Sequence, residues 1–139
     1  MLTLTLQETL SGWLEFNATR QQETIEFNID ITLMNRMKPW KPQPFTGVLR
    51  LAKRKLEVET HGYLTFKPTG TRYELRFRIP ELGSLEAKGE KSFDLFNLKE
   101  SFTTCPLTLY QDGQAIGYAE VVNQPPPVGF PLKAIRVNS

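Results

Sequence analysis

The stretch "TIEFNIDITL", residues 24–33, decides the fold class of this chain. Apolar and polar residues alternate in it for five cycles, and the apolar set is Ile25, Phe27, Ile29, Ile31 and Leu33. Successive side chains of a β-strand point to opposite faces, so this period of two places the apolar set on one face. The stretch therefore predicts a half-buried strand whose apolar face covers a core.

The same alternation recurs in "KLEVETHGYLTF", residues 55–66, and in "RYELRFRI", residues 72–79. We expect their inward residues to be Leu56, Val58, Tyr73, Leu75 and Phe77, and a bend or bulge at Gly62. Weaker strand candidates are residues 46–52, 84–91, 103–110, 116–123 and 132–137. The turn "QDGQ", residues 111–114, carries the Asp-Gly pair that tight hairpins favour.

Eight to ten short strands predict an all-β fold, because no stretch shows a sustained helical period and any helix is short, with residues 93–101 as the best candidate. An antiparallel sheet of this size hides its edges by closing or by pairing with a second sheet. We expect an antiparallel barrel or a strongly curved sandwich. The 139 residues suffice for one core, so we expect one barrel domain over 1–139 with a proline-rich tail at 123–139.

Composition narrows the class of protein. The chain is 40% hydrophobic and 23% charged, with a formal net charge of +2, which is globular and too weakly basic to indicate nucleic acid binding. Cys105 is the single cysteine, so neither a disulfide within the chain nor a multi-cysteine metal site is expected. The sequence shows no secretion signal and no membrane span, and we expect a cytoplasmic protein.

The first strand raises a question, because "LQETLSGWLEF", residues 6–16, places Glu8 among leucines and Trp13 among polar residues. If the strand is regular, Glu8 points inward and Trp13 outward; a bulge, or a bend between Gln7 and Ser11, is the alternative. An inward Glu8 needs a cationic partner, a polar cavity or a place near the barrel mouth. The proline-rich tail is one candidate cover for Trp13.

Signals for catalysis are absent from the sequence. His61 is the sole histidine and lies on a polar strand face, and Cys105 has no nucleophile signature around it. Neither a phosphate-binding loop nor a metal motif occurs. We therefore predict no catalytic residue, no metal and no cofactor.

The loop "NRMKPWKPQPF", residues 35–45, is the best candidate for contact with a protein partner. Trp40 lies between prolines and beside Lys38 and Lys41, and rigid aromatic and cationic residues are typical of interface anchors. The alternative is a lid in which Met37 and Trp40 plug one end of the barrel.

Several stretches in order resemble a small all-β bacterial module, found as an accessory segment of cholesterol-oxidase-like (GMC-type) flavoprotein oxidoreductases and as stand-alone proteins. They are "QETLSGW", "FNIDITLMNRM", "FTGVLRL", "LEVETHGYLTF", "RYELRFRI", "EAKGEK" and "TTCPLTLY", from Gln7 to Tyr110. The chain departs from the module at "GEKSFDLFN" and in its proline-rich tail. The resemblance implies a lipocalin-like or related barrel and carries over no activity.

Three functions remain open at the level of sequence. The leading one is a non-enzymatic barrel that holds a small apolar ligand, with Glu8, Tyr73 and Phe77 as the ligand-binding candidates. The second is a protein-interaction or accessory subunit of an oxidoreductase. The third is a lipocalin-like barrel enzyme, which would need acid and base groups inside, where parity places only Glu8.

Overall fold

The computed structural model describes residues 3–33, 40–68, 70–92, 104–123 and 135–138, and these residues form nine strands. The strands are β1 (Thr3–Phe16), β2 (Gln22–Leu33), β3 (Gln43–Leu51), β4 (Leu56–Lys67), β5 (Gly70–Ile79), β6 (Gly83–Ser92), β7 (Thr104–Gln111), β8 (Gln114–Asn123) and β9 (Ile135–Asn138). The all-β prediction is confirmed, and the helix candidate at 93–101 lies outside the described residues.

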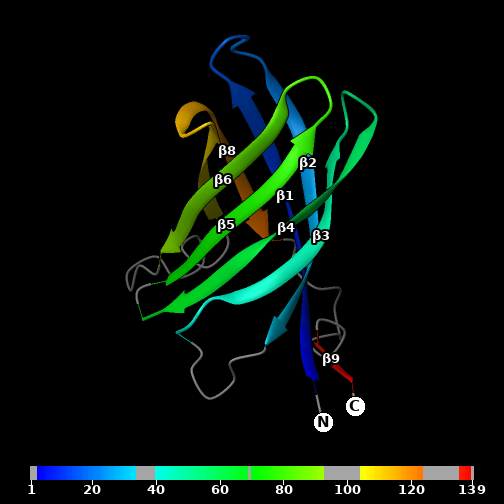
Figure 1. Cartoon of the computed structure of the whole chain (residues 1–139), viewed down its shortest axis with the longest axis vertical. Helices are drawn as coiled ribbons and strands as arrows, with labels where there is room; N and C mark the ends of the chain where they lie inside the picture. Colours follow the sequence, from blue (N-terminus) through cyan, green and yellow to red (C-terminus); the bar gives the residue numbers. More distant parts are fainter. Residues whose placement is uncertain (1–2, 34–39, 69, 93–103, 124–134, 139) are drawn as a thin grey trace.

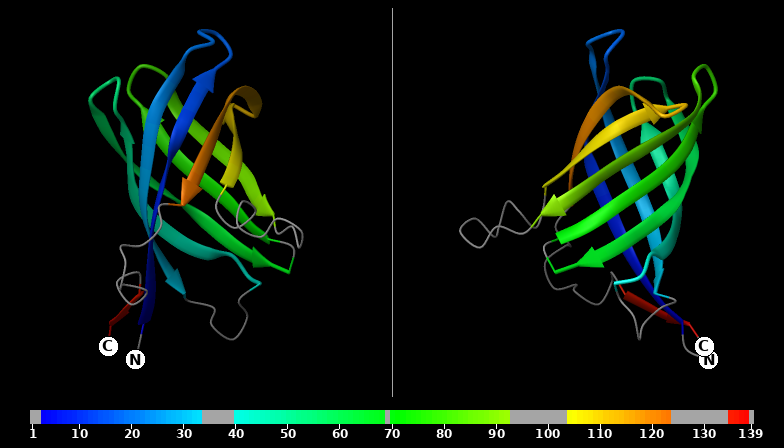
Figure 2. Two further views of the ribbon diagram at one scale, coloured as in Figure 1. Left: turned by 180° about the vertical axis from the view of Figure 1, so that it is seen from behind. Right: turned by 60° about the vertical axis from the view of Figure 1, so that its left-hand side comes forward.

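The strands close into a barrel (Figures 1 and 2). Each strand from β1 to β8 pairs antiparallel with its neighbour in sequence, and β1 also pairs with β8, so eight strands form a continuous wall. The ninth strand pairs only with the beginning of β1, from Thr3 to Leu6. The barrel alternative is thus confirmed over the sandwich. We call the end with the turns β1–β2, β3–β4, β5–β6 and β7–β8 the upper end and the opposite end the lower end.

The predicted apolar faces point into the barrel. Seven of the expected inward residues are buried: Ile25, Phe27, Ile29, Ile31, Tyr73, Leu75 and Phe77. Leu56 and Val58 are only partly buried, although they pack against the core. They lie at the upper end of β4, where that strand no longer pairs with β5.

Strand β1 is continuous, which answers the question raised by Glu8 and Trp13. Leu10 and Leu14 are each 1% exposed, so the leucine face points inward and Glu8 shares it. Trp13 is half-buried on the outer face, where it stands opposite Thr24 of β2 and Glu120 of β8. The bend is not formed, and the tail segment 124–134 lies outside the described residues.

Gly62 does not mark a bulge, since β4 and β5 pair there in regular register, Gly62 opposite Leu75. Its role is a close approach between strands. A Cβ atom added at Gly62 would lie 1.8 Å from the backbone oxygen of Glu74. The absence of a side chain is what lets the two backbones meet in this strongly curved wall.

We expect Gly62→Ala to lower the free energy of unfolding by about 1–3 kcal/mol or more, because backbone on β5 must move to admit the methyl group. Chemical denaturation of the two proteins measures this difference. Thr46→Ala, at an exposed outward position of β3, is the control and should stay within about 0.5 kcal/mol of the original chain. Equal stability of the two variants would contradict the close approach.

Candidate functional site

A polar cluster lies inside the lower half of the barrel, where the sequence predicted an inward carboxylate. The hydroxyl of Tyr73, from β5, donates a hydrogen bond to Oε1 of Glu8, from β1, over 3.0 Å. Tyr73 is 1% exposed, and Glu8 is half-buried. Two of the three predicted ligand-binding residues therefore meet, and they satisfy one another.

Lys91 of β6 adds a cation to this cluster. It is 7% exposed, and its Nζ lies 5.5 Å from the centre of the Tyr73 ring. Of the three alternatives for an inward Glu8, a cationic residue is present in the cluster, since Lys91 contacts the same Tyr73 that donates to Glu8. The sequence pattern could have predicted the burial of Lys91, because this residue shares its parity in β6 with the buried Leu85 and Ala87.

Burial keeps two groups of this region protonated. Desolvation, and then the charge of Glu8, raise the pKa of Tyr73. Desolvation also raises the pKa of the Cys105 thiol to about 12, against an opposing effect of the Lys91 charge. Cys105 is 0% exposed, and a buried thiol that keeps its proton is a weak nucleophile.

A cleft opens in the barrel wall between β4 and β5. The ladder between these strands ends at the pair Thr60 and Phe77. Beyond it β4 continues to Leu56 in contact with β3, and β5 continues to Ile79 in contact with β6, so the two hairpins diverge towards the upper end. The diverging tips are visible in Figure 1.

This cleft has a volume of about 700 Å³. The residues of its floor are Val58, which is partly buried, and Phe77 and Leu85, which are core residues 4% and 1% exposed. Its polar rim is formed by Glu59, His61, Arg76, Arg78, Ser84, Glu86, Tyr110 and Asp112. The third predicted ligand-binding residue, Phe77, thus lines a different site from the one that Glu8 and Tyr73 form.

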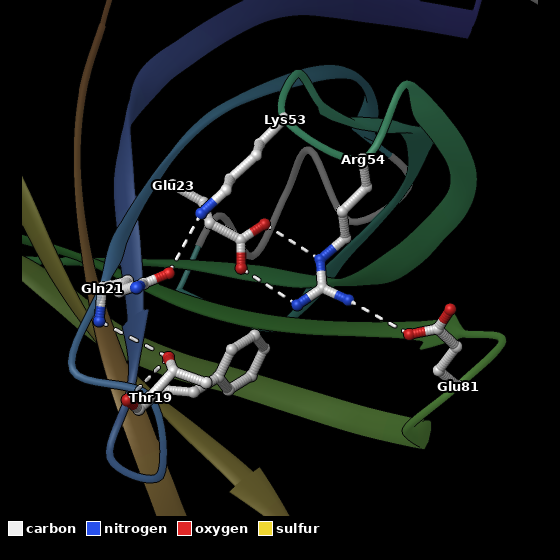
Figure 3. Close-up of polar contacts among 7 residues, drawn as sticks. Thr19, Gln21, Glu23, Lys53, Arg54 and Glu81 are labelled. Atoms are coloured by element: carbon white, nitrogen blue, oxygen red, sulfur yellow. Dashed lines mark hydrogen bonds and ion pairs between the residues drawn. The ribbon is translucent and has the colours of Figure 1, made fainter.

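Arg54 joins the tips of the diverging hairpins (Figure 3). From the β3–β4 turn it donates hydrogen bonds of 2.9 and 3.0 Å to the two carboxylate oxygens of Glu23, and it lies 3.8 Å from Glu81 of the β5–β6 turn. Glu23 is 6% exposed, so Glu8 is not the only inward carboxylate, contrary to our expectation. Neither Arg54 nor Glu81 is among the residues that line the cleft.

The partner-contact candidates are only partly described. Trp40 is 59% exposed and Lys41 is exposed, which does not fit a lid in which Trp40 plugs the barrel. Lys38 and Met37 lie outside the described residues. His61 is exposed on the outer face of β4, as expected, but it lies on the rim of the cleft, which the sequence did not indicate.

Comparison with known proteins gives no match to a family, a curated protein or a solved structure. Within the described ranges, no group of three His, Cys, Asp or Glu side chains is placed to hold a metal ion. Over the same ranges no helix is long and apolar enough to cross a membrane.

We expect the hydrogen bond between Tyr73 and Glu8 to appear as coupling in a double-mutant cycle. Tyr73→Phe should cost about 1.5–3 kcal/mol in the original chain and about 1 kcal/mol in a Glu8→Gln background, because a charged acceptor strengthens the bond. Denaturant unfolding measures both costs, with Tyr63→Phe on the exposed face of β4 as the control. Additive effects would contradict the hydrogen bond.

Cys105 should make the stability depend on alkaline pH. Above pH 9.0 the unfolded thiol loses its proton, whereas the folded thiol keeps it up to about pH 12, so stability falls as pH rises. The slope should approach about 1.4 kcal/mol per pH unit. Between about pH 9 and 10, before Tyr73 adds its own effect, Cys105→Ala should remove most of this slope. An unchanged slope in the variant would show that the thiol is not the group responsible.

Proposed function

We propose that this barrel binds a small molecule in the cleft between the β3–β4 and β5–β6 hairpins. The observation that carries the proposal is a cleft of about 700 Å³ with an apolar floor and a polar rim. Binding sites for small molecules have volumes of about 300–1,000 Å³ and combine apolar walls with a few polar groups. The proposed activity is binding, without a chemical step.

The polar cluster at the lower end is assigned a structural role. The Tyr73 hydroxyl already donates to Glu8, and the Lys91 ammonium lies over the Tyr73 ring. These interactions let Glu8 occupy the inner face of β1 without leaving an unpaired carboxylate. The cleft beside Phe77 is different, because its charged rim is open to a ligand and Val58 of its floor is only partly buried.

A dye and a blocking substitution test the binding function. Nile red, a neutral dye whose emission shifts in an apolar site, should bind saturably to the purified chain. Ser84→Trp should weaken this binding about tenfold or more, because Ser84 lines the cleft and the indole would fill it. Val122→Trp, at an exposed position of β8 outside the cleft lining, is the matched control and should bind as the original chain does. Equal binding by both variants would refute the proposed site.

Contact with a protein partner is the second candidate function. The exposed Trp40, beside the exposed Lys41, favours it, since tryptophan is enriched at interfaces. This surface would lie on the segment that precedes β3, outside the lining of the cleft.

A further inference from the structure

We propose that the ligand of the cleft is a small apolar molecule carrying both a carboxylate and an ammonium group, such as an apolar amino acid or short peptide with free ends. This inference rests on the proposed binding function and names the class of its ligand. It is carried by Glu59 on β4 and by Arg76 and Arg78 on β5, charges of opposite sign that line the cleft and make no ion pair with any described residue.

The first pair of charges follows from the register of β4 and β5. Thr60 stands opposite Phe77 in the last ladder pair, so Glu59 and Arg78 would be opposite each other if the ladder continued. The divergence of the strands separates them, and within the described part of the chain neither side chain makes an ion pair. A carboxylate and a guanidinium therefore face each other across an open cleft.

Arg76 adds a second guanidinium on the β5 side. Its cross-strand neighbour on β6 is Glu86, but the Glu86 carboxylate contacts Lys88 at 3.5 Å. The outward arginines away from the cleft behave differently, since Arg50 pairs with Glu57 at 3.1 Å and Arg72 pairs with Glu74 at 3.6 Å. Among the residues that the structure describes, ion pairing along β5 thus stops where the strand reaches the cleft.

The charges of the rim decide which ligand fits. Two cations on β5 favour a carboxylate, because arginine binds it through parallel hydrogen bonds. Glu59 on β4 repels a simple anion and favours an ammonium group. The other titratable groups of the lining are His61 opposite Arg76, Glu86 on β6, Tyr110 on β7 and Asp112 in the β7–β8 turn. Carboxylates therefore lie on both flanks of the β5 arginines, and a zwitterion can place its carboxylate at the arginines and its ammonium at Glu59.

The floor decides the body of the ligand. Val58 presents apolar surface below the charged rim, whereas Phe77 and Leu85 are almost fully buried, so the part of the ligand that lies against Val58 is apolar. The volume of about 700 Å³ leaves room for more than a single residue. An apolar dipeptide meets each of these requirements, with its side chains on the floor and its ends at the rim.

Three forms of one dipeptide test the proposal by isothermal titration calorimetry. They are phenylalanyl-leucine with free ends, its N-acetyl form without the ammonium, and its C-terminal amide without the carboxylate. The free form should bind about tenfold tighter than either blocked form, because each blocked form lacks one of the two charges that the rim recognises. Free L-phenylalanine, measured in the same way, separates recognition of an amino acid from that of a longer chain.

Variants assign each end of the peptide to one side of the cleft. Arg78→Gln should abolish the preference for the free form over the amide, and Glu59→Gln should abolish the preference over the N-acetyl form. The matched controls are Arg72→Gln and Glu57→Gln, outward residues of the same two strands that are already ion-paired. Both controls should keep both preferences.

Three results would overturn the inference. Equal affinity for the free and blocked forms means that the charges of the rim do not select the ligand. Absence of binding by every form means that the proposed class of ligand is wrong. Loss of preference in the control variants means that the effect is not local. If Nile red still binds in any of these cases, the binding function stands and only the ligand class is wrong. If Nile red does not bind either, the proposed function fails together with this inference.

Discussion

The rest of the structure depends on the ladder between β1 and β8, which closes the sheet. β8 pairs with the second half of β1, from Leu10 to Phe16, although more than a hundred residues separate the two strands in sequence. The approach is close, because a Cβ atom added at Gly12 would lie 1.9 Å from the backbone oxygen of Glu120. Closure leaves no free edge among β1 to β8 over the paired region, and it fixes which face of every strand is interior.

That closure explains how much of the fold was predictable from sequence. Each strand has one apolar face, so the parity of Ile25 or Leu75 predicts its burial without knowledge of the partner strands. The same parity placed Glu8 inside and Trp13 outside, as the structure has them. Lys91 and Glu23 obey the parity rule as well, and we missed them because charged residues were not expected on a buried face. Their partners, Tyr73 and Arg54, come from distant parts of the sequence, and parity carries no information about pairing.

The cleft could not have been predicted from sequence. Hydrophobic alternation continues through Val58 on β4 and through Phe77 and Ile79 on β5, as it would if the strands stayed paired. The two strands separate because β4 stays paired with β3 and β5 stays paired with β6 beyond the end of their own ladder. Which strand each one follows depends on the arrangement of the whole barrel. The sequence identified Phe77 as a ligand-binding candidate from its inward position alone, and the structure places it on the cleft floor, apart from the hydrogen-bonded Glu8 and Tyr73.

An opening in a barrel wall has an energetic cost, since the edges of the diverging strands lack ladder hydrogen bonds there. Arg54 limits that cost at the upper end. Its two hydrogen bonds to the buried Glu23 form a partly buried pair with bidentate geometry, whereas Glu81 is largely exposed and its contact at 3.8 Å contributes little. The β3–β4 tip is therefore held firmly to β2, and the β5–β6 tip is held weakly to β3–β4. If the cleft adapts to a ligand, the β5–β6 hairpin is the element expected to move, and it carries both Arg76 and Arg78.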